Sequence, residues 1–247
     1  MPISASLIFP VFNDEQTVRI VAEKAVRLLQ AETDQFEIII VNDGSPDRSG
    51  DIADELSKQY PCIRVIHHRA NLGYGMAIRS GLAACRYEYI CMIDGDDQYE
   101  VGDFSKLLKL RDFYDLIITF RYKKVYSGTR TFISWVYNKT LRILFRTPFR
   151  DVSTGIRVAR KALIEDIPLD SSSPFIGAEL AIKAMLKGYR VGEVGIQTFP
   201  RAFGKGASTS PKNILATIRE MWRVYRIIFS DEYDLPTNRT RSGKARE

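Results

Sequence analysis

The sequence contains no uninterrupted apolar run of about 18 residues, the length that a bilayer-spanning helix needs. We therefore expect any membrane association to be peripheral or to depend on a membrane-protein partner. The first residues also lack a basic flank followed by a long apolar run, so we expect no signal peptide. These absences predict a cytoplasmic location, with any membrane contact made at the cytoplasmic face.

Cysteine and histidine are both scarce. The three cysteines, Cys62, Cys85 and Cys91, have no CxxC spacing, which argues against a disulfide framework or a zinc site. A reducing compartment fits this usage. The two histidines, His67 and His68, are adjacent in the sequence, and neither is an obvious catalytic base.

Acidic residues are unevenly distributed. The chain has 36 Lys and Arg against 30 Asp and Glu, which favours anionic partners but is also compatible with a solvated basic surface. From residue 116 to residue 150 there is no acidic residue, and aromatic and aliphatic residues alternate with Arg and Lys. This pattern is typical of an amphipathic helix at an anionic lipid surface, or of a core helix with a basic outer face. Segment 213–229 is open to the same two interpretations.

Short Ile- and Val-rich runs alternate with segments of helical periodicity in the first half of the chain. This alternation predicts βαβ units and an α/β fold with a mostly parallel sheet. We expect strands at residues 5–10, 36–41, 63–66, 89–93 and 116–120, and helices at 15–32 and 49–58. The second half is less regular and richer in isolated Arg and aromatic residues.

The strongest local signal is the acidic run that follows the fourth expected strand. It contains Asp94, Asp96 and Gln98. In an open α/β sheet, ligands bind beyond the carboxyl ends of the strands. Oxygen ligands at this spacing suit Mg²⁺ or Mn²⁺, which bridges carboxylates to diphosphate oxygens. A solvated turn with acidic side chains is the alternative.

Two weaker polar clusters, at residues 10–15 and 42–45, follow the first and second expected strands. Each alone is ordinary turn chemistry. Because the carboxyl ends of parallel strands meet at one edge, we expect both clusters to join the acidic run there. Such an edge can hydrogen-bond a base and a ribose, with Phe12 packing on the base.

Four segments in this order, PVFNDE, VNDGSPD, NLGYGMAIRSGL and DGDDQ, resemble the nucleotide-sugar-binding half of the family 2 inverting glycosyltransferases of GT-A fold. The later stretch FRDVSTGIRVARKAL resembles dolichyl-phosphate mannose synthases and other polyprenyl-phosphate glycosyltransferases. The resemblance implies a GT-A catalytic domain over residues 1–211. Residues 1–120 would bind the nucleotide sugar and 121–211 the acceptor. Beyond the region of resemblance we expect a helix at 212–234 and, from its polar, Pro-containing and basic composition, a disordered tail at 235–247.

The resemblance also implies two sets of donor-site residues. Those near the nucleoside are Pro10, Phe12, Asp14 and Asp43. Those at the metal and diphosphate are Asp94, Asp96 and Gln98, with Mg²⁺ or Mn²⁺ as the ion. Three departures from the family pattern are Phe12 for Tyr, Asp97 for an apolar residue and Ile156 for Phe, so GDP and UDP donors both stay open.

The acceptor is inferred from a missing base. Transfer to a hydroxyl needs a general base, whereas an ionised phosphate does not. Hydroxyl-directed relatives carry the base in a Glu-Asp pair, but this chain reads PFIGAEL there, without Asp. This favours a lipid phosphate. Glu179 stays open as a base or as a carboxylate at a helix N-terminus.

Three cationic side chains and one hydroxyl complete the expected site. Arg201, Lys205 and Ser208 resemble a flexible loop that closes over the donor diphosphate, and a plain surface turn is the alternative. Arg121 follows the fifth expected strand and is expected to grip the acceptor phosphate. The expected catalytic residues are therefore Asp96, Arg121, Arg201 and Lys205. Two other functions stay open: glycosyl transfer to a hydroxyl, and non-catalytic binding of nucleotide sugars or nucleic acid. The acidic strand ends argue against nucleic acid.

Overall fold

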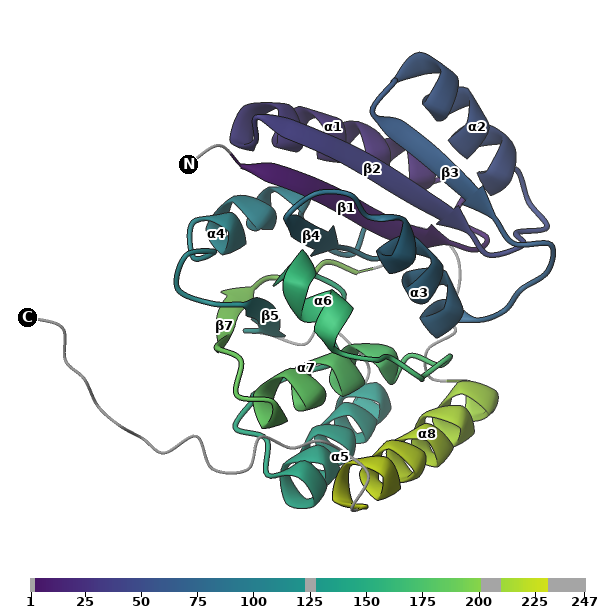
Figure 1. Ribbon diagram of the computed structural model, residues 1–247. Helices are drawn as coiled ribbons and strands as arrows, with labels where there is room; N and C mark the ends of the chain where they lie inside the picture. Colours follow the sequence, from purple (N-terminus) through teal and green to yellow (C-terminus); the bar gives the residue numbers. More distant parts are fainter. Residues whose placement is uncertain (1–2, 123–127, 201–209, 231–247) are drawn as a thin grey trace, which may run out of the picture.

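A computed structural model describes residues 3–122, 128–200 and 210–230. A seven-stranded sheet runs through it in the order β3-β2-β1-β4-β6-β5-β7 (Figure 1). Six strands are parallel to one another, and β6 alone runs antiparallel to its neighbours β4 and β5. The strands are β1 Ser4–Val11, β2 Gln35–Asn42, β3 Ile63–His67, β4 Tyr89–Met92, β5 Leu116–Arg121, β6 Arg157–Arg160 and β7 Val191–Ile196.

Helices cover both faces of the sheet, which is why β1 and β2 read as continuous apolar runs. One core lies under α1 (Val18–Glu32), α2 (Ser49–Gln59) and the short pair η1 (Val101–Asp103) and α4 (Phe104–Leu108). The other lies under α3 (Tyr74–Ala84), α6 (Lys161–Asp166) and α7 (Ile176–Leu186). This confirms the predicted α/β class and the mostly parallel sheet.

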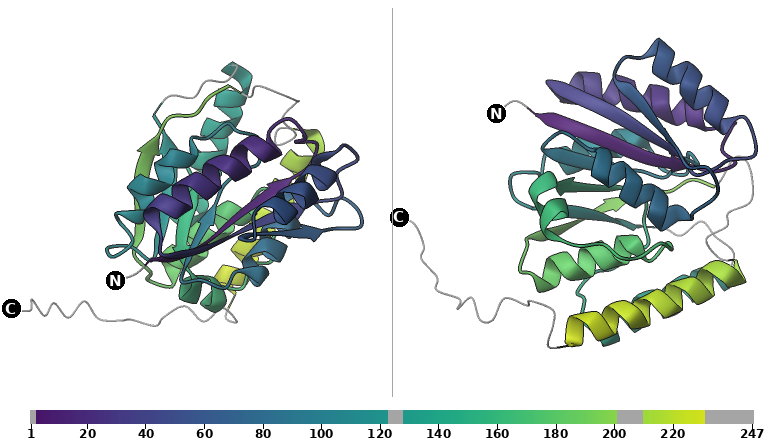
Figure 2. Two further views of the ribbon diagram at one scale, coloured as in Figure 1. Left: turned by 90° about the horizontal axis from the view of Figure 1, so that it is seen from above. Right: turned by 45° about the vertical axis from the view of Figure 1, so that its right-hand side comes forward.

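Helices α5 (Gly128–Phe145) and α8 (Pro211–Phe229) lie side by side at one end of the molecule, beyond α7 (Figures 1 and 2). The ring of Phe145 on α5 packs against the rings of Tyr225 and Phe229 on α8, with centroids 5.8 and 6.5 Å apart. Segment 213–229 is therefore helical, whereas segment 116–150 begins with strand β5 and is helical over Gly128–Phe145, and the two helices form a pair. Of the helices in the described ranges, none is both long and apolar enough to cross a membrane.

All five expected strands are present, and the first expected helix is shorter than predicted. It begins at Val18 rather than at residue 15, because the Asp14 carbonyl accepts hydrogen bonds from the backbone of Thr17 and Val18 in a turn. Strands β6 and β7 were not predicted. They place residues from both predicted halves of the chain in one sheet.

The reversed strand β6 determines what reaches the ligand edge. The carboxyl ends of β4 and β5 point to that edge, and an antiparallel strand between them begins there. Residues 151–156, which lead into β6, therefore lie beside the ends of both neighbours. This is how the RDVSTG stretch joins the acidic run in space.

Candidate functional site

The ends of β1, β2 and β4 meet at one edge of the sheet, as predicted. The backbone N–H of Asp43, after β2, donates to the Val11 carbonyl of β1 at 3.0 Å. The Ile93 N–H, after β4, donates to the Ile8 carbonyl at 3.1 Å. The structure thereby brings together the three polar clusters that follow these strands.

The end of β1 packs directly on the acidic turn. The Asp14 carboxylate accepts the backbone N–H of Phe12 at 2.9 Å, and the Thr17 hydroxyl donates to the Gly95 carbonyl at 2.7 Å. A Cβ on Gly95 would stand only 2.6 Å from the Pro10 carbonyl, so this approach requires glycine. Phe12 as a residue is 39% exposed. It therefore has an open surface for the base stacking predicted from sequence.

Asp94 and Asp96 lie within the turn after β4. Asp94 accepts a hydrogen bond from the Tyr74 hydroxyl at 2.8 Å, and Asp96 accepts the backbone N–H of Gln98 at 3.2 Å. Asp97, which lies between Asp96 and Gln98, has a φ of +53° and forms an ion pair with Lys24 of α1 at 2.9 Å. The unusual Asp97 therefore has a structural partner on α1.

The donor set of this turn fits a divalent cation at a diphosphate. Within residues 3–122, 128–200 and 210–230, no group of three or more His, Cys, Asp or Glu side chains forms a cage of its own. Mg²⁺ and similar ions at phosphate sites take one or two carboxylates and complete their shell with water and phosphate oxygens. Asp94, Asp96 and Gln98 offer two carboxylates and an amide oxygen, which is the composition that such an ion needs.

Asp94 is fixed by two residues that the sequence interpretation did not assign. Desolvation, followed by the nearby Asp94 carboxylate, raises the pKa of Tyr74 well above its usual value, so its hydroxyl stays protonated and donates to Asp94. Gly155 lies against the same carboxylate, because a Cβ at this position would collide with it. The backbone N–H of Gly155 donates to the Tyr99 hydroxyl at 3.0 Å. In the sequence, the position of Tyr74 between Gly73 and Gly75 was the feature that could have indicated its role.

Asp43 organises the loop before α3. Its carboxylate accepts the backbone N–H groups of Leu72 and Gly73, both at 2.9 Å. It also lies 2.7 Å from Nδ1 of His68, whose Nε2 lies 2.8 Å from the Ser80 hydroxyl. Since an ionised carboxylate can only accept, Nδ1 of His68 donates to Asp43. The predicted nucleoside contact is thus also the hub of a buried hydrogen-bond chain.

Replacing His68 by Ala is expected to lower the free energy of unfolding by about 1–3 kcal/mol, because it removes a donor from a buried carboxylate. Urea denaturation measures this. The matched control is His67→Ala, since the His67 side chain is 43% exposed and pairs with Asp54, which is itself half exposed. The control should cost less than about 1 kcal/mol. Equal losses in both variants would contradict the role given to His68.

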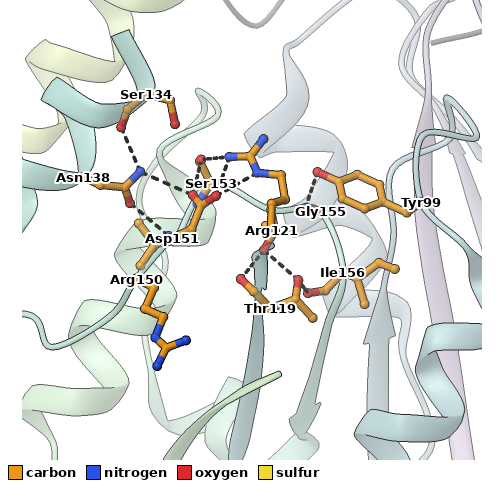
Figure 3. Close-up of polar contacts among 12 residues, drawn as sticks. Tyr99, Thr119, Arg121, Ser134, Asn138, Arg150, Asp151, Ser153, Gly155 and Ile156 are labelled. Carbon is orange, nitrogen blue, oxygen red and sulfur yellow. Dashed lines mark hydrogen bonds and ion pairs between the residues drawn. The ribbon is translucent and has the colours of Figure 1, made fainter. Parts of the chain in front are cut away.

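Arg121 lies at the end of β5 in an ion pair that the sequence did not predict. Its guanidinium contacts the Asp151 carboxylate at 2.6 and 2.8 Å and donates to the Ser153 hydroxyl at 2.7 Å (Figure 3). The side chains of the pair are 5% and 3% exposed. Asn138 of α5 donates to the same Asp151 carboxylate at 3.3 Å. Arg121, which is expected to bind the acceptor phosphate, is therefore held in place by residues 150–155 and by α5.

Glu179 is completely buried in α7. Its carboxylate forms an ion pair with Lys183 at 2.6 Å and accepts the backbone N–H groups of Asp170 and Ser171. Of the two roles left open by the sequence, this geometry favours a structural one, because a base must reach the proton that it removes. Arg201, Lys205, Ser208 and the tail at 235–247 lie outside the described residues.

Residues 6–167 match the family model described as glycosyl transferase family 2. Polyprenol monophosphomannose synthase of Mycolicibacterium smegmatis is 29% identical over 213 residues, covering 80% of this chain and 78% of that protein. Dolichyl-phosphate beta-glucosyltransferase ALG5A of Trichomonas vaginalis is 31% identical over 109 residues, covering 42% of this chain and 34% of that protein. The uncharacterized glycosyltransferase EpsJ of Bacillus subtilis is 38% identical over 129 residues, covering 52% and 36%. The matched regions thus span only about a third of the last two relatives.

Among solved structures, glucosyl-3-phosphoglycerate synthase from Mycobacterium tuberculosis, in complex with Mn²⁺, UDP and phosphoglyceric acid, superposes with a TM-score of 0.71. It is 18% identical, and the match covers 91% of this chain and 78% of that one. At this identity the match establishes the fold, which is the GT-A arrangement expected from the sequence.

Proposed function

Because the chain belongs to glycosyl transferase family 2, we propose that it transfers a sugar from a nucleotide diphosphate donor to a polyprenyl phosphate at a membrane surface. The observation that carries this proposal is the convergence of four carboxylates, those of Asp14, Asp43, Asp94 and Asp96, at one edge of the sheet. Arg121, the last residue of β5, lies at the same edge. The names of two relatives, a polyprenol monophosphomannose synthase and a dolichyl-phosphate glucosyltransferase, support this acceptor class.

The donor is proposed to lie across the ends of β1, β2 and β4. Phe12, Asp14 and Asp43 would contact the nucleoside, and Asp94, Asp96 and Gln98 would hold Mg²⁺ or Mn²⁺ at the diphosphate. The bound ion would neutralise charge on the departing nucleotide diphosphate. A fold neighbour described with Mn²⁺ and UDP supports this placement. Either GDP or UDP is compatible with these residues.

The proposed reaction is a single displacement. An oxygen of the acceptor phosphate forms a bond to the anomeric carbon as the bond from that carbon to the diphosphate breaks. The electron pair leaves with the nucleotide diphosphate, and the configuration inverts. An ionised phosphate brings no proton to remove, which agrees with the buried position of Glu179. Arg121 would orient the acceptor phosphate, while Arg201 and Lys205 would stabilise the leaving charge.

The outer surfaces of α5 and α8 are proposed to meet the membrane. Large apolar side chains are exposed on both helices: Phe132, Trp135, Val136 and Ile143 on α5, and Leu215, Ile218, Trp222 and Phe229 on α8. Exposed cations accompany them: Lys139 and Arg142 on α5, and Lys212, Arg219, Arg223 and Arg226 on α8. The α5 sequence has no acidic residue, and the one acidic residue of α8 is buried. Exposed apolar groups with cations fit an anionic lipid surface.

A transfer assay tests the proposed function. Nucleotide sugars carrying UDP or GDP, with Mg²⁺ or Mn²⁺, are each offered a polyprenyl phosphate or the matching polyprenol. We expect product from the phosphate alone. Product from the alcohol would instead favour a hydroxyl-directed enzyme. Tight donor binding without any product would favour a non-catalytic binder of nucleotide sugars.

A further inference from the structure

Glu220 is the only acidic residue of α8, and it lies in the buried stripe of that helix, 7% exposed. Its carboxylate accepts both the backbone N–H and the hydroxyl of Ser172, each at 2.9 Å. It also accepts the backbone N–H of Ser173 at 3.1 Å and the Ser173 hydroxyl. Partial burial acts to raise the pKa of Glu220, but these hydrogen bonds outweigh it and hold the pKa below its ordinary value. Glu220 therefore binds this loop as a carboxylate.

The loop that Glu220 binds packs on the first residues of α3. The Ser172 carbonyl accepts the backbone N–H of Gly75 at 2.8 Å. A Cβ on Gly75 would collide with the Ser172 backbone, and a Cβ on Gly73 would lie 3.1 Å from the Ser172 carbonyl. The position of the loop and the position of the α3 N-terminus are therefore tightly coupled.

The same first residues of α3 hold two carboxylates of the proposed donor site. The backbone N–H of Gly73 donates to Asp43 at 2.9 Å, and the Tyr74 hydroxyl donates to Asp94 at 2.8 Å. A continuous series of hydrogen bonds and backbone contacts thus runs from Glu220, through Ser172 and α3, to Asp43 and Asp94.

We propose that Glu220 is a positioning residue that links α8 to the donor site, so that binding to an anionic lipid surface and binding of the nucleotide strengthen each other. This inference rests on the proposed function. It adds a regulation of the donor site by the surface on which the acceptor lies.

The sign of the linkage follows from charge. While α8 is packed, Glu220 is covered by the two serines, and the exposed charges of α8 are all cations. If α8 left the loop, the Glu220 carboxylate would lose its serine donors, and its uncovered negative charge would weaken the attraction between this helix and an anionic surface. An anionic surface therefore favours the packed arrangement, and the packed arrangement holds Asp43 and Asp94. Linkage requires the effect to be reciprocal, and typical couplings change affinity at least about fivefold.

The experiment measures binding of UDP and of GDP, each with Mn²⁺, to the full chain by calorimetry. Each titration is run without vesicles, with phosphatidylcholine vesicles, and with vesicles that also contain phosphatidylglycerol. We expect the anionic vesicles to tighten nucleotide binding by about fivefold or more. Co-sedimentation with the same vesicles reports lipid binding in parallel.

Two variants separate the steps. Glu220→Gln removes the charge and places a side-chain amide next to the serine donors. This variant should sediment with anionic vesicles like wild type, but the vesicles should not tighten its nucleotide binding. Trp222→Ser, on the exposed face of α8, should bind nucleotide normally in solution and lose vesicle binding and tightening together. Thermal unfolding checks that both variants are folded.

Three results would overturn the inference. They are tightening in Glu220→Gln equal to that in wild type, nucleotide affinity in wild type that vesicle binding leaves unchanged, and no binding of wild type to anionic vesicles. If wild type bound neither nucleotide under any condition, the proposed function itself would fail and the inference with it. The vesicle-free titration therefore distinguishes the two failures.

Discussion

Replacing Asp96 by Asn is expected to lower the rate of sugar transfer on the order of 1000-fold. The amide keeps the size of the side chain and an oxygen for the Gln98 N–H, but it removes one of the two carboxylates proposed to hold the metal ion. Metal stabilisation of transition-state charge contributes several kcal/mol, and each 1.36 kcal/mol is tenfold in rate. Steady-state transfer with saturating Mn²⁺ measures the loss, and urea denaturation should find stability changed by less than about 1 kcal/mol.

The matched control is Asp97→Asn, one residue along the same turn. Asp97 pairs with Lys24 and has a positive φ, a conformation that Asn tolerates well. The control removes one negative charge at nearly the same place and should keep most of the transfer rate. Near-normal turnover in Asp96→Asn would disprove the metal assignment, and equal losses in both variants would indicate a general effect of charge.

Replacing Asp151 by Ala is expected to lower the free energy of unfolding by about 3–5 kcal/mol, because it leaves the Arg121 guanidinium buried without its counter-ion. The same change removes the acceptor for Asn138 of α5. Urea denaturation followed by circular dichroism measures the loss. Transfer should fall as well, since Arg121 is proposed to orient the acceptor phosphate.

The double variant Arg121→Met, Asp151→Leu separates stability from activity. Replacing both partners of a buried ion pair by apolar residues is often neutral for stability, so most of the lost free energy should return. Transfer should remain impaired, because the guanidinium is gone. If Asp151→Ala were as stable as wild type, solvent would reach this pair more than the 5% and 3% side-chain exposures indicate.

The first half of the fold was predictable because its strands contain apolar runs that are covered on both faces of the sheet. β1 and β2 contain the apolar runs LIF and IIIV, which mark them as buried strands. By contrast, β6 has only four residues, Arg157–Arg160, with an arginine at each end. β7 contains two glycines and a glutamate. Such strands are stabilised by their neighbours in the sheet, so the local sequence contains little sign of them.

The proposed ligand contacts were predictable from their places after strands, but their supporting partners were not. Asp94 and Asp96 directly follow a strand, and the structure places them at the expected edge. Glu220 lies 48 and 47 residues from Ser172 and Ser173, whose hydroxyls bind it, and Tyr74 lies 20 residues from Asp94. No periodicity connects residues so far apart. Read locally, Glu220 is an ordinary surface charge on an amphipathic helix.

The segment between β5 and β6 leaves the sheet and returns to it at the same place. The chain departs at Arg121 and comes back at Asp151, and these two residues form the ion pair shown in Figure 3. The ion pair joins the two ends of the connecting segment that contains α5. Because both ends of this connecting segment are fixed to the neighbouring strands β5 and β6, its length or outer surface can change without moving β1, β2 and β4. Substitutions on the exposed face of α5 therefore change the outer surface of this segment and leave the ion pair at its base in place.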